Sequence, residues 1–86
     1  MARYEIEISR TAERQLRKLP PQDQQRVARK MSSLAHDPYP PGARKLAGYE
    51  DVLRVRVGLW RILYSVGAAT LIIIILKVGH RGDVYR

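Results

Sequence analysis

The sequence predicts an α+β domain in which a two-helix hairpin packs on one face of an antiparallel sheet, in the order β-α-α-β-β-β. Three observations predict this class. An alternating segment opens the chain, two segments with helical periodicity follow, and three strand-like segments joined by short connections close it. Because 86 residues suffice for one hydrophobic core, we expect residues 1–86 to form a single domain.

A change in the spacing of apolar side chains, from every second residue to every third or fourth, separates the first strand from the first helix. Residues 3–8 alternate apolar and charged side chains, which is typical of a half-buried strand. Ser9 or Thr11 is suited to cap the helix that follows, whose apolar side chains recur at three- and four-residue spacing: Ala12, Leu16 and Leu19. Pro20-Pro21 ends this helix, and Pro21 suits the first turn of a second one.

The second helix carries one apolar stripe, formed by Val27, Met31 and Leu34. We expect it to stop at Asp37-Pro38, because the residue before a proline is disfavoured in the helical region. The following residues, 37–49, have no periodicity and are rich in proline and glycine, so they are expected to form a loop. The helical hairpin must therefore cover the strands beyond that loop.

Three strand segments follow the loop. Residues 52–57 and 60–66 alternate apolar with other side chains, whereas 71–78 is apolar almost throughout, as expected in mid-sheet or for a strand buried on both faces. The connections between them, at 58–59 and 67–70, are short enough to imply antiparallel neighbours.

The hairpin around Gly58 has a predictable register. With Gly58-Leu59 at the centre of a II′-type turn, Val57 pairs with Trp60 and Arg56 faces Arg61. All apolar partners then lie on one face, where Trp60 is expected in the core. The other face gathers three arginines: Arg54, Arg56 and Arg61. Like charges opposed across strands are destabilising, so this arrangement indicates a bound anion.

The last strand brings further polar groups to the same place. An antiparallel strand over 71–78 returns to the Trp60 end of the hairpin and delivers His80 and Arg81 beside the arginines, with Tyr85 within reach. Guanidinium groups offer planar forks to phosphate oxygens, and a phenol can stack on a base or carry a proton. This set is what a phosphodiester and an adjacent base require.

Composition points to the same kind of partner. There are 16 Lys and Arg against 8 Asp and Glu, giving a net charge of +8, so nucleic acid is the first class of partner to consider. The absence of cysteine excludes disulfides and thiolate sites. No segment approaches the ~20 apolar residues of a membrane span, and no signal peptide is evident. We therefore expect a cytoplasmic protein without metal, cofactor or membrane.

Each feature also has a plain structural interpretation. Single surface arginines are usually solvated, and the basic residues of the two helices are expected to form either a solvated face or part of a footprint for a large RNA. A lone histidine such as His80 is more often a turn or packing residue than a catalyst. Only the convergence of several groups favours a site.

The motifs resemble those of a known superfamily. The segments Lys45-Leu46-Ala47-Gly48-Tyr49, 53–64 and 78–85, read as Leu-x-Gly, Arg-x-x-Tyr, Val-Gly-His-Arg and Val-Tyr, are similar to the RelE/ParE superfamily of toxins from type II toxin–antitoxin modules. The resemblance covers nearly the whole chain and implies a RelE-like microbial RNase-type fold.

Two branches of that superfamily matter. RelE-like members are metal-independent endoribonucleases (mRNA interferases) that cleave mRNA in the A site of the 70S ribosome, the 2′-hydroxyl attacking its own phosphodiester, whereas ParE-like members poison DNA gyrase. Similarity to RelE implies charge stabilisation by Arg61, a leaving-group role for Arg81, and base stacking or proton handling by Tyr85. The expected substrate-binding residues are Arg54, Arg56, Arg44 and Lys45.

One departure changes the proton chemistry. Arg54 and Arg56 stand where the best-known members have lysines, and arginine is not deprotonated at physiological pH. The general base is therefore expected to be His80 or Tyr85, with Asp51 and Glu50 as remaining candidates.

We expect an mRNA interferase whose partners are the ribosome, mRNA and a cognate antitoxin with an acidic or amphipathic segment. Because only Arg86 follows Tyr85, inhibition is expected by direct occlusion of the arginines or by bulk that prevents entry to the A site. The alternatives are a ParE-like gyrase poison and a non-catalytic basic RNA-binding remnant.

Overall fold

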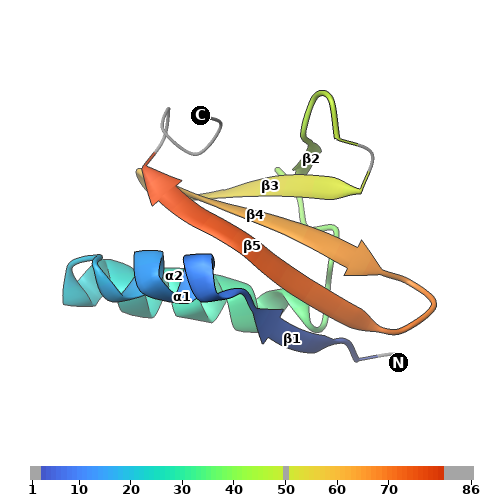
Figure 1. The fold of residues 1–86 in the computed structure, drawn as a ribbon, viewed down its shortest axis with the longest axis horizontal. Coiled ribbons are helices and arrows are strands. Elements are labelled where there is room, and N and C mark those ends of the chain that lie inside the picture. Colours follow the sequence, from blue (N-terminus) through green and yellow to red (C-terminus); the bar gives the residue numbers. More distant parts are fainter. Residues whose placement is uncertain (1–2, 50, 81–86) are drawn as a thin grey trace.

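A five-stranded sheet covered on one face by two helices makes up the fold (Figure 1). The computed structural model of the chain describes residues 3–49 and 51–80. Its elements are β1 (Glu5–Ile8), α1 (Arg10–Arg17), α2 (Pro21–Leu34), β2 (Arg44–Lys45), β3 (Val52–Val57), β4 (Trp60–Gly67) and β5 (Ile72–His80). In this part of the chain, neither helix is long and apolar enough to cross a membrane.

The predicted order of elements is confirmed, with two differences in the sheet. The strand order is β1-β5-β4-β3-β2, and β1 pairs with β5 in parallel rather than antiparallel orientation. A parallel pair needs a crossover, and the helical hairpin and the strands after it supply a long one. The short strand β2, inside the predicted loop, pairs with β3 and is too brief to show a period.

The helix α1 is tied to β5 by side-chain hydrogen bonds. Ser9 caps α1 by accepting the Ala12 N–H at 3.0 Å, and its hydroxyl also donates to the Leu76 carbonyl at 2.9 Å. Further along, Gln15 Oε1 accepts the Val78 N–H at 2.7 Å. Because β1 pairs only as far as Ile75, these polar groups satisfy the edge of β5 that β1 leaves uncovered.

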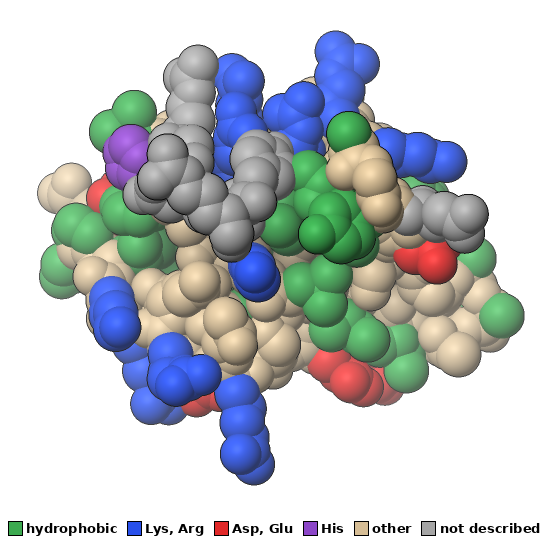
Figure 2. Space-filling view, turned by 45° about the horizontal axis from the view of Figure 1, so that its top comes forward, with side chains coloured by type: hydrophobic (Ala, Val, Ile, Leu, Met, Phe, Trp, Pro, Cys, Tyr) green, Lys and Arg blue, Asp and Glu red, His purple; other side chains and the backbone are tan. Residues whose placement is uncertain are grey.

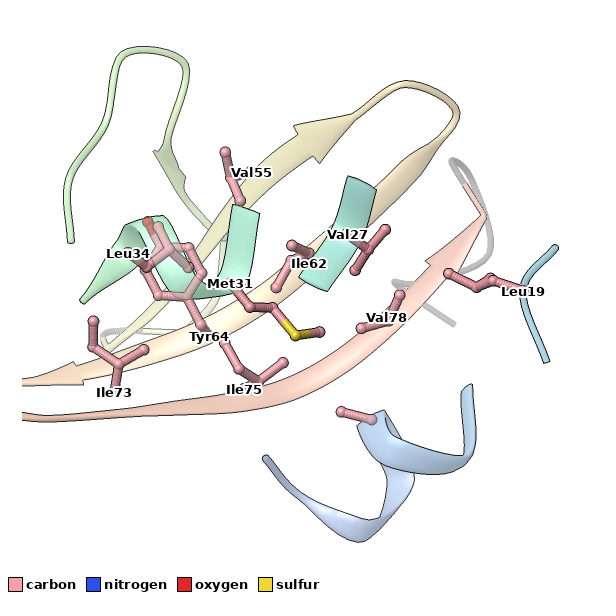
Figure 3. Close-up of a cluster of buried hydrophobic side chains, with 11 residues drawn as sticks. Leu19, Val27, Met31, Leu34, Val55, Ile62, Tyr64, Ile73, Ile75 and Val78 are labelled. Atoms are coloured by element: carbon pink, nitrogen blue, oxygen red, sulfur yellow. The ribbon is translucent and has the colours of Figure 1, made fainter. Parts of the chain in front are cut away.

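The hydrophobic core lies between the helices and the sheet. As predicted, Pro21 begins α2, which ends at Leu34, a little before the Asp37-Pro38 stop. Figure 3 shows the side chains of α2 directed toward those of β4 and β5. The buried cluster comprises Ala12, Leu19, Val27, Met31, Leu34, Val55, Ile62, Tyr64, Ile73, Ile75 and Val78. Within residues 3–49 and 51–80, both helices pack on this one face, and none covers the opposite face of the sheet.

An irregularity in β5 decides which side chains reach that free face. Leu63 pairs with Lys77, but Tyr64 pairs with Ile75, so Leu76 is an extra residue in β5. Strict alternation from Ile75 would direct Lys77 toward the helices. The bulge reverses the alternation, so that Val78 is buried in the core and Lys77 is exposed. As expected β5 lies in mid-sheet, but it is buried on only one face.

Candidate functional site

The helix-free face of the sheet is hollowed into a cleft of about 650 Å³, which we call the sheet cleft. Strands β3, β4 and β5 form its floor, and the connection between β2 and β3 forms one wall. The cleft is lined by Lys45, Leu46, Ala47, Tyr49, Val52, Arg54, Arg56, Arg61, Leu63, Leu76 and Lys77. Among these lining residues, which all belong to the described part of the chain, five are cationic and none is acidic.

The three predicted arginines lie together in the cleft, in the register that the Gly58 turn implies. Arg56 pairs with Arg61, and Arg54 pairs with Leu63. Gly58 has a φ of +59°, which fits the first central position of the II′ turn that sets this register. The hairpin prediction is therefore confirmed residue by residue.

The cationic face extends beyond those three residues. Arg44 of β2 pairs with Arg54, which makes a second pair of facing arginines. Each such pair costs about 0.2–1 kcal/mol by repulsion. Figure 2 shows Lys and Arg side chains along the top of the view and a second group at the lower left. A face that gathers so much charge of one sign attracts anions.

Arg61 is the least exposed of the cationic residues described in the sheet cleft. Its side chain is 9% exposed, whereas Arg54 is half-buried and Arg56 is exposed. A charge shielded from water acts on a nearby anion through a lower effective dielectric. Arg61 therefore exerts the strongest field at the floor of the cleft, and Arg54 and Arg56 extend it toward the mouth.

Two cleft residues were not singled out from the sequence. Lys77 reaches the cleft only because of the bulge at Leu76, which no period-two pattern reveals. Tyr49 belongs to a segment quoted for the resemblance, but no site role was expected of it, because it stands in the loop before β3, directly after the turn residue Gly48. Both were hidden because their positions depend on irregular backbone.

His80 lies apart from the cleft. It pairs with Trp60 across β4 and β5, and the two rings meet edge to face with centroids 5.6 Å apart. Trp60 packs against the core as predicted, so His80 lies on the helix side of the sheet, opposite the arginines. This differs from the predicted convergence, because the register places Gly79, not His80, beside Arg61. Arg81, Tyr85 and Glu50 lie outside the described residues.

A buried tyrosine anchors the loop that leads to β2. The Tyr64 hydroxyl, which belongs to the Arg-x-x-Tyr motif, donates to the Pro38 carbonyl at 2.8 Å and so fixes the start of the loop that leads to β2. Burial raises the pKa of Tyr64 to about 12, with smaller contributions from the negative charges that Tyr39 and Asp37 can carry. The phenol stays protonated, as a hydrogen-bond donor must.

Metal ligands are not gathered in this part of the chain. Among residues 3–49 and 51–80, no group of three or more His, Asp or Glu side chains is close enough to hold a metal ion. The polar chemistry that the described cleft offers is that of guanidinium groups, ammonium groups and one phenol.

A two-helix hairpin on one face of a sheet, with the cationic cleft on the other, agrees with the RelE-like fold that the resemblance implied. The family described as the ParE toxin of the type II toxin–antitoxin system parDE matches residues 6–85. The chain belongs to this family of type II toxins.

Individual relatives are similar over their full length. The toxin RelG of Mycobacterium tuberculosis is 34% identical over 87 residues, covering 96% of this chain and 97% of that protein. Among solved structures, the toxin in the RelBE2 toxin–antitoxin complex of the same organism has 29% identity and a TM-score of 0.84, covering 96% and 97% of the two chains. The RelE–RelB complex of Pyrococcus horikoshii gives 30% identity and a TM-score of 0.82, covering 98% and 100%.

Proposed function

We propose that this toxin is an endoribonuclease that cleaves mRNA in the ribosomal A site and so stops translation. The observation that carries the proposal is the sheet cleft, where Arg54, Arg56 and Arg61 converge with two lysines and no acidic side chain among the described lining residues. Such a cleft suits a phosphodiester with its flanking phosphates. The similarity to toxins named RelG and RelE supports the same activity.

The reaction is a transesterification within one strand. The 2′-oxygen forms a bond to phosphorus while the bond from phosphorus to the 5′-oxygen breaks, so the products are a cyclic phosphate and a 5′-hydroxyl. The proton of the 2′-hydroxyl goes to a base, and the leaving 5′-oxygen takes up a proton. Negative charge grows on the phosphoryl oxygens, and Arg61, which has the least solvent around it, stabilises that charge.

The remaining roles fall to residues around Arg61. Arg54 and Arg56 clamp the phosphates, and Arg44 and Lys45 add to substrate binding from the β2 side.

The leaving-group role and the base follow the resemblance. Arg81 acts at the leaving oxygen, and Tyr85 becomes the preferred base because His80 lies on the helix side of the sheet. The Lys77 ammonium lines the cleft and can supply the proton that the leaving oxygen takes up.

We also propose that an antitoxin neutralises the toxin. Both similar structures described above are complexes, one named the toxin–antitoxin complex RelBE2 and the other the RelE–RelB complex. A net charge of +8 favours a partner with an acidic segment, which would compete with RNA for the cationic cleft. The ribosome and mRNA place the action of the toxin in the cytoplasm.

Cleavage of mRNA on programmed 70S ribosomes tests the activity. Wild-type protein is expected to cleave, and Arg61→Ala is expected to lower kcat by about 10²–10³, as loss of one charge-stabilising donor does elsewhere. Arg29→Ala is the matched control, because Arg29 is an exposed arginine of α2 on the other side of the molecule. If Arg61→Ala cleaves as fast as wild type, the catalytic site is misplaced.

A ParE-like activity is the second candidate, since the matching family is described by the ParE toxin. A gyrase poison would leave mRNA intact on ribosomes and would stabilise cleaved DNA in gyrase assays. Absence of both activities, with RNA binding retained, would indicate a non-catalytic basic RNA-binding protein.

A further inference from the structure

The connection between β2 and β3 builds a fixed apolar wall beside the cationic floor. The Tyr49 N–H donates to the Leu46 carbonyl at 3.1 Å, and the Leu46 N–H donates to the Val52 carbonyl at 2.9 Å. Between them, Gly48 has a φ of +85°, the value that the third residue of a type II turn requires. These bonds set the backbone of Tyr49 at the cleft.

Tyr49 is unusually exposed for a residue with this position. It lines the sheet cleft and yet is 62% exposed, so most of its ring is available to a ligand. Leu46 and Ala47 stand beside it in the same wall, and Leu63 of the floor is only 5% exposed. The cleft therefore offers a flat aromatic ring and an apolar surface next to a group of cations.

Two kinds of ligand present an anion beside an apolar group. A single-stranded RNA carries a phosphate at every nucleotide and a flat base next to it, and bases stack on aromatic side chains. An acidic peptide with an apolar side chain is the other. Arginine forks match phosphate and carboxylate oxygens alike, so the aromatic ring decides between the two ligands. The cleft favours RNA, because the exposed ring of Tyr49 offers a flat face on which a base can stack.

We propose that Tyr49 is a base-stacking platform of the sheet cleft, which holds the nucleobase adjacent to the phosphate bound by Arg54, Arg56 and Arg61. This proposal rests on the proposed function, since it assumes that the cleft binds RNA. It adds an aromatic residue of the β2–β3 connection to the site, distinct from Tyr85 near the C-terminus. Stacking makes the site sensitive to the presence of a base and tolerant of its identity.

Binding of a labelled single-stranded RNA hexanucleotide and of an abasic hexanucleotide with the same number of phosphates tests the platform. Fluorescence anisotropy is expected to show that Tyr49→Ala weakens binding of the RNA about tenfold or more, and that Tyr49→Phe, which keeps the ring, binds like wild type. Neither change should alter binding of the abasic chain. Tyr39→Ala is the matched control, because Tyr39 is 58% exposed and does not line the cleft.

Several results would overturn the platform. Wild type could bind the RNA and the abasic chain with equal affinity, or Tyr49→Ala could bind the RNA as tightly as wild type does. Tyr49→Phe could also lose as much affinity as Tyr49→Ala. Unchanged RNA binding with a weakened antitoxin complex would make the wall a peptide-docking surface. The proposed function fails separately, if wild-type protein binds RNA and does not cleave mRNA on ribosomes.

Discussion

Replacing Tyr64 by phenylalanine removes one hydroxyl from the core and changes little else. The side chain is 0% exposed, and its hydroxyl donates to the Pro38 carbonyl at 2.8 Å. Loss of such a hydrogen bond lowers the free energy of unfolding by about 1 kcal/mol. We expect Tyr64→Phe to be less stable by that amount at pH 7, which corresponds to a fall in Tm of roughly 4–8 °C in a domain of this size.

The difference in the free energy of unfolding between wild type and Tyr64→Phe reverses its sign at high pH. The pKa of Tyr64 is raised from 10.0 to about 12 in the folded protein, so the folded state holds the phenol proton more tightly than the unfolded state does. The stabilisation is complete below pH 10 and is lost as the pH rises from 10 to 12. By linkage, the loss reaches about 2 kcal/mol at pH 12. Phenylalanine has no proton to lose, so Tyr64→Phe becomes more stable than wild type by about 1 kcal/mol.

Urea unfolding followed by the fluorescence of Trp60, the single tryptophan, measures both effects. Curves for wild type and Tyr64→Phe at several values between pH 7 and pH 12 give the difference directly, because the other titrating groups are common to both proteins. Tyr49→Phe is the control, because it removes a hydroxyl from an exposed tyrosine outside the core. A difference that stays constant from pH 7 to pH 12 would refute the assignment of a buried, hydrogen-bonded Tyr64 hydroxyl.

Two further predictions concern the backbone around the cleft. Gln15→Leu leaves the Val78 N–H of β5 without its acceptor, so we expect a loss of about 1–3 kcal/mol and faster hydrogen exchange at Val78; unchanged exchange would contradict the bond. Gly58→Ala combines a positive φ with a Cβ about 3.2 Å from a guanidinium of α2, and should cost about 1–2 kcal/mol in urea unfolding. Gly42 has a φ of +91° and no atom within 4 Å of the position of a Cβ, so Gly42→Ala measures the backbone cost alone. A larger loss of stability for Gly42→Ala than for Gly58→Ala would contradict the close contact at Gly58.

Local patterns predicted those parts of the site that depend on neighbouring residues in the chain. A glycine suited to a two-residue turn fixed the pairing of β3 with β4, and with it the shared face of Arg54, Arg56 and Arg61. A cap at Ser9 or Thr11 and the start of α2 at Pro21 were predicted for the same reason, since each depends on a few adjacent residues, and the structure has the cap at Ser9. The short motifs quoted in the sequence analysis also identified the superfamily.

Placements that depend on distant parts of the chain were predicted less well. The alternation of residues 3–8 shows which side chains share a face, but it carries no information about the partner strand or its direction. Only the packed fold pairs β1 with β5 in parallel. In the same way, His80 was expected beside the arginines from the direction of β5 alone, whereas the register turns it toward Trp60.

The sequence by itself determined the order of the elements, the hairpin register, the cluster of arginines and the toxin superfamily, because all of these follow from local spacing and motifs. Only the tertiary structure decided that the arginines lie on the floor of a cleft, that the bulge at Leu76 turns Lys77 into it, and that Tyr49 lines it. The physical reason is that a cleft forms between segments brought together by packing. Its shape therefore depends on bulges and turns that a regular sequence pattern does not record.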